Sequence, residues 1–156
     1  MNTSENYMPL PENPRAIWMS ELAQASWADL QEFSNTINDW PSYELIHAPE
    51  RGAIMLRGRI SGQGAAFPLG ECSVVRCTLC DAMGYSGVAY VMGGQEEHAL
   101  WAARWDALLQ NPAGRDHLWN TVILVLRTRR LAREGQRANK TTATQVQFFS
   151  MESMRT

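Results

Sequence analysis

The sequence predicts an α+β fold, in which a mostly antiparallel sheet carries helices on one face and follows an N-terminal helical hairpin. Two helical patterns come first, strand patterns separated by glycine-containing turns occupy the middle, and amphipathic helical patterns follow. Strands and helices that are grouped along the chain in this way are typical of α+β domains. The length of 156 residues, with 45% apolar and 19% charged residues, fits one globular domain with a modest core.

We expect residues 1–13 to form a disordered arm, residues 14–151 a single domain and residues 152–156 a flexible tail. Residues 1–14 are polar and rich in proline, which is unlike a secretory signal. Apolar runs such as residues 122–126 are far too short to cross a bilayer. The sequence therefore predicts a cytoplasmic protein that does not associate with membranes.

Two capping signals predict the helical hairpin. Asn13 followed by Pro14 is a side-chain cap with proline at the first helical position. Ser26, with Asp29 three residues later, resembles a capping box for the second helix, which we expect to end at residues 40–41. The apolar stripes of the two helices comprise Ile17, Trp18, Leu22 and Ala25 in the first, and Leu30, Phe33 and Ile37 in the second.

Three strands are predicted over residues 53–60, 67–79 and 85–92, with turns at residues 61–64 and 81–84 between them. In the third strand both faces are largely apolar. A strand that is buried on both sides needs a cover on each side. The helices of this chain can supply one cover, and a partner protein can supply the other.

The C-terminal third is predicted to alternate between helix and strand. Residues 96–110 have the pattern of an amphipathic helix with acids in its first turn. Residues 122–126 could form a buried strand or a piece of helix, and we favour the strand because β-branched residues dominate and the run is short. A basic helix over residues 127–138 and a last strand over residues 145–151 complete the prediction.

The charge of the chain is unevenly distributed. Residues 127–140 hold six basic residues and one acid, a net charge of +5, so the rest of the chain carries −7 because the total is −2. This segment is either a solvated helix face or a surface that meets an anion or an acidic partner. A general nucleic-acid binder would be basic overall, and acids such as Asp29 and Glu32 on the second helix would repel DNA phosphates.

Six tryptophans are many for a chain of this size. They could fill the core, but tryptophan is rarely buried in full and is enriched where proteins meet. We therefore interpret them as part of a protein interface.

The chemistry-bearing residues do not form a complete catalytic motif. Cys72, Cys77 and Cys80 match part of an iron–sulfur spacing but lack a fourth ligand, so we interpret them as buried small residues. The histidines show no metal-ligand spacing, and the glycines match neither a P-loop nor a dinucleotide fingerprint. His98, at a predicted helix start, could be a general acid or merely a solvated imidazole.

Short segments spread over the chain form a recognisable series. They are Arg15-Ala-Ile-Trp-Met19, Gly62-Gln-Gly64 followed by Phe67, Leu69-Gly-Glu-Cys-Ser73, Arg76-Cys77, Gly84-Tyr-Ser86, Tyr90-Val-Met-Gly93, His98-Ala99, Asp106-Ala-Leu-Leu109 and Val146-Gln-Phe-Phe-Ser-Met151. In order and spacing these segments resemble the PhnG family, a subunit of the bacterial carbon–phosphorus lyase system. The resemblance extends over residues 15–151, and its specificity lies in the colinear order of the segments.

This resemblance implies a non-autonomous subunit that assembles with PhnH, PhnI and PhnJ. It implies a role in the step in which a phosphonate displaces adenine from MgATP to give a ribose 1-phosphonate 5-triphosphate. Nucleosidase chemistry is usually credited to PhnI and the radical iron–sulfur cleavage to PhnJ. This chain is thus expected to bind no cofactor itself, while MgATP is a substrate of the complex.

Two alternatives remain open beside the accessory subunit. The chain could contribute residues to a shared active site, with His98, Glu71, Arg76, Tyr85 and Ser86 as candidates, or it could be an unrelated small module that binds an anion or a partner. One segment departs from the family pattern, because Gly94-Gln95-Glu96-Glu97 replaces a basic turn and would lose any phosphate contact there. The excess apolar pattern predicts that the isolated chain forms a dimer or a larger species.

Overall fold

The computed structural model describes residues 8–59, 64–93 and 95–143. Within them the predicted α+β fold is confirmed. In chain order the elements are α1 (Pro14–Gln24), α2 (Trp27–Ser34), β1 (Tyr43–Gly58), β2 (Phe67–Asp81), β3 (Ser86–Met92), α3 (Glu96–Gln110), α4 (Pro112–Leu118), a π-helical turn η2 (Trp119–Ile123) and α5 (Leu124–Ala143).

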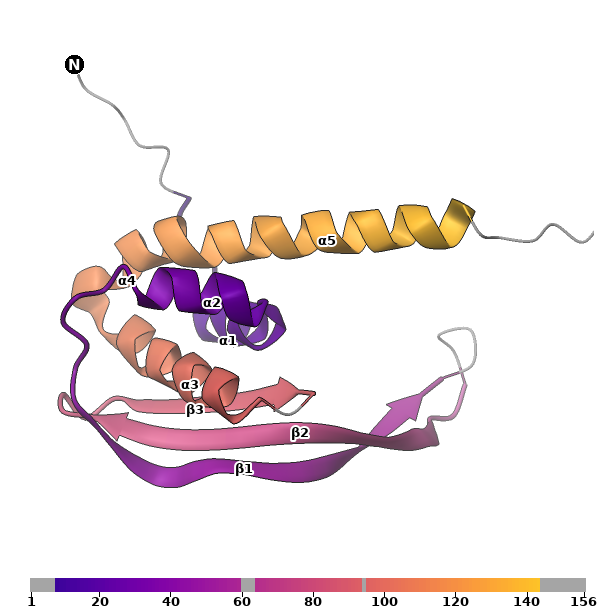
Figure 1. Ribbon diagram of the computed structural model, residues 1–156, viewed down its shortest axis with the longest axis horizontal. Helices are drawn as coiled ribbons and strands as arrows, with labels where there is room; N and C mark the ends of the chain where they lie inside the picture. Colours follow the sequence, from indigo (N-terminus) through magenta and orange to yellow (C-terminus); the bar gives the residue numbers. More distant parts are fainter. Residues whose placement is uncertain (1–7, 60–63, 94, 144–156) are drawn as a thin grey trace, which may run out of the picture.

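The strands form an antiparallel sheet in the order β1-β2-β3. All helices lie on one side of this sheet: α3 rests on the strands, α1 and α2 pack above it, and α5 forms the outermost layer (Figure 1). β1 and β2 are much longer than β3, so they continue past β3 and α3 as a two-stranded ribbon. The core lies between sheet and helices and includes Trp18, Leu22, Leu30, Val75, Leu79, Trp105, Leu109, Ile123 and Leu126.

The helical hairpin is capped as its sequence predicts. The Asn13 side chain accepts a hydrogen bond from the Ala16 amide, and Pro14 is the first helical residue. The Ser26 hydroxyl oxygen accepts from the Asp29 amide at 3.1 Å. The second helix, however, ends at Ser34 and not at Trp40, because the Trp40 indole N–H turns back to donate to the Ser34 carbonyl.

Helix α3 approaches β3 so closely that only glycine fits at residue 87. A Cβ atom placed on Gly87 would lie 1.9 Å from the carbonyl oxygen of Ala103. The buried side of α3 is correspondingly built from small residues, namely Ala99, Ala102, Ala103 and Ala107. These alanines let the helix backbone lie close to the sheet.

The first strand is longer than predicted. It begins at Tyr43 rather than residue 53, and it pairs with β2 through register shifts between Leu45 and His47 and between His47 and Glu50. Pro49, which cannot donate to a ladder, lies within this irregular stretch. Local propensity misses the strand start because long-range pairing with β2 decides it.

The predicted strand over residues 122–126 is wrong. These residues form the end of η2 and the start of α5. Val122, Ile123 and Leu126 are all buried, and a short apolar run looks the same in a buried helix as in a buried strand. The predicted basic helix over residues 127–138 is confirmed within α5, whereas the last strand predicted over residues 145–151 lies outside the described residues.

The tryptophans are mainly core residues, so the interface interpretation is wrong for half of them. Trp18, Trp105 and Trp119 are almost completely buried. The indole N–H of Trp18 donates to Asp106, and that of Trp105 donates to Ser34. These hydrogen bonds remove the cost of burying an unpaired indole N–H. The other three tryptophans are half-buried.

Of the arm expected over residues 1–13, the structure describes residues 8–13. Leu10 packs on the core, and the Met8 amide donates to the Asn120 side-chain oxygen. Among the described residues, none of the helices combines the length and apolar character that crossing a bilayer requires.

Candidate functional site

The predicted site residues lie apart in the described structure. His98 is buried in the first turn of α3, where its Nε2 lies 2.9 Å from the Leu22 carbonyl oxygen. A carbonyl only accepts, so this nitrogen carries the proton and His98 donates. The imidazole ties α3 to α1 and is not presented to solvent as a general acid.

Arg76 and Glu71 lie on β2, away from His98. The Arg76 guanidinium makes two hydrogen bonds to Glu50 on β1, at 2.9 and 3.2 Å, and these bonds raise the arginine pKa. Both partners are exposed, so the pair contributes little to stability. Glu71 is exposed further along the ribbon, opposite Met55.

Tyr85 and Ser86 are brought together, but only as neighbours in the β2–β3 turn. Asp81 shapes this turn, because its Oδ1 accepts from the amides of Met83 and Tyr85. Ser86 contributes its carbonyl, which accepts from Gln110 and Arg15. The candidates therefore occupy three separate regions, and the described residues also hold no group of three or more His, Cys, Asp or Glu side chains arranged for a metal ion.

The three cysteines follow the predicted alternation. Cys72 and Cys80 lie on one face of β2, and Cys77 lies on the other. Cys77 is fully buried in the core, and burial raises the pKa of its thiol. It packs as a small apolar residue.

A buried aspartate that sequence reasoning missed joins three elements. Asp106 on α3 is completely buried and accepts from Arg15 and Trp18 on α1 and from the Val88 amide on β3. The Val88 amide is on the outer edge of β3, so this contact also covers part of that edge. The sequence pattern that could have revealed it is an acid close to Trp105 and Leu109, within the apolar stripe of the predicted helix.

The basic segment of α5 meets acids of the helical hairpin. Arg130 pairs with the buried Glu21 of α1, at 2.7 and 2.9 Å. Arg129 and Arg133 each reach Asp29 of α2 at 2.7 Å. The acidic partner that the charge pattern suggested is therefore in the same chain. We call these contacts the α5 clamp.

The turn that departs from the family pattern carries an ion pair. Glu96, at the start of α3, accepts from Arg51 on β1 at 3.1 Å, and both side chains are exposed. Glu96 at this turn is thus paired with Arg51 of the sheet in the same chain.

One face of the sheet carries no cover from the described residues. The cross-strand partners on this open face include Ile54 opposite Cys72, Arg76 opposite Tyr90 and Val74 opposite Met92. Tyr90 and Met92 are 56% and 61% exposed. The open face and the ribbon together expose the large apolar side chains Ile46, Ile54, Met55, Leu56, Phe67, Leu69, Tyr90 and Met92.

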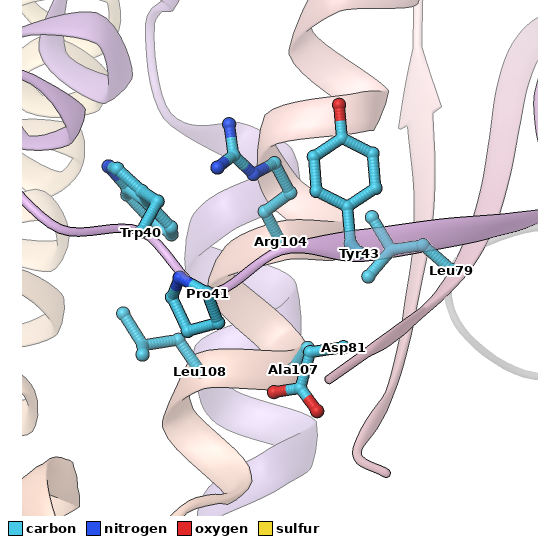
Figure 2. A pocket seen from close by; sticks show the side chains of 8 residues that line it. All are labelled: Trp40, Pro41, Tyr43, Leu79, Asp81, Arg104, Ala107 and Leu108. Atoms are coloured by element: carbon cyan, nitrogen blue, oxygen red, sulfur yellow. The ribbon is translucent and has the colours of Figure 1, made fainter. Parts of the chain in front are cut away.

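A second notable surface surrounds Arg104 on α3. Its guanidinium carbon lies 4.1 Å from the ring centre of Trp101, 4.6 Å from Trp40 and 4.7 Å from Tyr43. Figure 2 shows the guanidinium between Trp40 and Tyr43, with the Tyr43 hydroxyl directed to the same side. We call these four residues the arginine cage. The cavity beside it is also lined by Pro41, Leu79, Asp81, Ala107 and Leu108.

Separated polar candidates, buried polar contacts and an exposed apolar sheet face are typical of a protein that works within an assembly. Residues 13–155 match the family of the phosphonate metabolism protein PhnG. Over 133 residues the chain is 35% identical to the alpha-D-ribose 1-methylphosphonate 5-triphosphate synthase subunit PhnG of Rhizobium meliloti (strain 1021), with 85% of each chain covered. The chain belongs to the PhnG family.

Proposed function

We propose that the chain is a non-autonomous subunit of a ribose 1-phosphonate 5-triphosphate synthase, the core complex of a carbon–phosphorus lyase. In the cytoplasmic reaction of that complex, a phosphonate oxygen bonds to C1′ of the ribose of MgATP. The bond from C1′ to adenine breaks, and adenine leaves with a proton. The printed name of the Rhizobium meliloti relative, a synthase subunit, supports this proposal.

The open face is the observation that carries the subunit role. Exposed apolar side chains lie on both β1 and β3 across this face. Burying apolar surface provides roughly 25 cal/mol per Å², so a companion subunit would be held mainly by this face. We propose PhnH, PhnI and PhnJ as the companions, with the catalytic residues supplied chiefly by them, because the polar candidates of this chain lie apart.

Reconstitution tests the proposal. This chain and purified PhnH, PhnI and PhnJ are mixed with MgATP and methylphosphonate, and formation of ribose 1-methylphosphonate 5-triphosphate is followed by chromatography. We expect formation of this product to require this chain, and we expect the chain to co-elute with its companions. Full product formation without the chain, together with separate elution, would contradict the proposal.

Substitutions on the open face test how the chain joins the complex. Tyr90→Asp combined with Met92→Asp places two charges on the open face and should prevent co-elution. Leu131→Asp is the matched control, since Leu131 is a similarly exposed apolar residue, but on α5. Equal co-elution of the double variant and the control would exclude the open face as the main contact.

A further inference from the structure

Arg104 differs from the other half-buried arginines of the described chain. Arg15, Arg129, Arg130 and Arg133 are bound by carboxylates, and Arg115 donates to main-chain carbonyls. Arg104 contacts three aromatic rings, but no acceptor among the described residues lies within hydrogen-bonding distance of it. Within residues 8–59, 64–93 and 95–143, its five N–H donors thus have no hydrogen-bond acceptor. Burial also lowers the pKa of this guanidinium.

The acid that lines the same cavity is not such an acceptor. Asp81 makes no hydrogen bond to Arg104, and its Oδ1 accepts from two turn amides. Figure 2 shows the guanidinium directed away from Asp81 and Pro41. The guanidinium is therefore not aimed at Asp81, and the described residues supply no other hydrogen-bond acceptor for its donors.

The arginine cage holds the guanidinium in a fixed orientation. Trp40 packs edge-on against Trp101 and Trp105, and its indole N–H is anchored on Ser34. Rings on several sides restrict the arginine side chain, so little conformational entropy is lost when a ligand binds it. A planar guanidinium held in this way suits the two oxygens of a carboxylate.

We infer that the arginine cage is a binding point for a carboxylate side chain of a companion protein subunit. The inference rests on the proposed function and adds a second contact, separate from the open face. Arginine, tryptophan and tyrosine are the residue types that dominate binding hot spots. Leu45, two residues beyond Tyr43 on β1, is also exposed and extends the surface with an apolar side chain.

The cavity beside the arginine cage is too small to enclose a nucleotide. Its volume is about 10 Å³, room for roughly one water molecule, whereas small-molecule sites usually measure about 300–1,000 Å³. A carboxylate that contacts Arg104 from the molecular surface needs no deeper pocket, because the arginine is only half-buried and its guanidinium is directed away from Asp81 and Pro41.

Binding measurements on the full chain test this inference. The wild-type chain, Arg104→Ala and Arg104→Lys are titrated onto an immobilised complex of the companion subunits at low and high salt. We expect Arg104→Ala to weaken binding about 30-fold or more and to lose part of its salt dependence. Arg104→Lys should weaken binding by about 10-fold, because an ammonium neither stacks on the rings nor bonds both oxygens.

Arg137→Ala is the matched control, because it removes one positive charge from an exposed position on α5 and should bind as the wild type does. Only variants that keep the wild-type melting temperature are compared. Arg104→Lys is expected to be one of them, because its aliphatic stem still packs on the aromatic rings. If Arg104→Ala and Arg104→Lys bind as tightly as the wild type, the inference about the arginine cage is wrong but the proposed function stands. If the wild-type chain does not bind the companion subunits, both the inference and the proposed function are wrong. If the Arg104 variants assemble normally but raise the KM for MgATP, the cage binds a small-molecule anion and not a protein carboxylate.

Discussion

At the residue scale, Asp106 links α1, α3 and β3 through a single buried carboxylate. Its two oxygens accept from a guanidinium, an indole and a main-chain amide. A buried carboxylate is stable only when its charge and its lone pairs are matched. Asp106 is therefore a structural residue that holds the segment around Arg15 against α3.

Replacing Asp106 should cost about 3–5 kcal/mol of unfolding free energy, because Asp106→Asn removes the charge that Arg15 faces and turns a donor toward other donors. Urea denaturation followed by circular dichroism measures this loss. Asp116→Asn is the control, since Asp116 is exposed on α4, and its effect should stay within about 0.5 kcal/mol. Equal stability of the two variants would show that the buried contacts of Asp106 are not needed.

At the element scale, the α5 clamp determines where the last helix lies. Burial alone would raise the pKa of Asp29, but hydrogen bonds from Ser26, Arg129 and Arg133 outweigh this effect and hold the pKa below 3.8, its ordinary value. The hydrogen bond from Arg129 likewise lowers the pKa of Glu32. α5 is thus held on the hairpin by charges that depend on pH.

The clamp should weaken in acid. Since the pKa of Asp29 is lower in the folded chain than in the unfolded chain, its stabilisation is complete well above pH 3.8 and is lost as the pH falls below that value. Asp29→Asn should lower the free energy of unfolding at neutral pH by about 1 kcal/mol. In this variant the free energy of unfolding should also fall less steeply between about pH 5 and pH 3. Urea titrations over this range, with the exposed Asp39→Asn as control, measure both effects. An unchanged pH profile in Asp29→Asn would contradict this account.

Elements with their own local signals could be predicted from the sequence. The caps at Asn13 and Ser26 predicted the starts of the two hairpin helices. The amphipathic pattern predicted α3 with the correct bounds, residues 96–110. Residues 122–126 could not be assigned, because their β-branched side chains suit any buried element. The start of β1 and the partners of Asp106 and Arg104 depend on contacts between residues far apart in the chain, which no local pattern encodes.

At the scale of the whole molecule, the described helices cover only one side of the sheet, and the ribbon extends beyond β3 and α3 (Figure 1). The sequence predicted a strand with two apolar faces, and the structure shows which of these faces the helices cover. Companion subunits remain a proposal, but the exposed side chains of the open face give that proposal a location.

The isolated chain should self-associate through the open face. Light scattering at micromolar concentration should show a dimer or a larger species, because exposed Tyr90 and Met92 favour burial against a second copy. The Tyr90→Asp, Met92→Asp double variant should shift toward monomer, and Leu131→Asp should not. A monodisperse wild-type monomer would contradict this prediction.

The irregular course of β1 bears on how such a chain avoids polymerisation. β1 lies at the edge of the sheet. A long regular edge strand could pair with the edge strand of another copy, and repeated pairing of this kind would build fibrils. The register shifts on either side of His47, and the missing amide hydrogen of Pro49, break that margin into shorter pieces. An incoming strand would match only one piece at a time, so the irregular margin opposes edge-to-edge polymerisation.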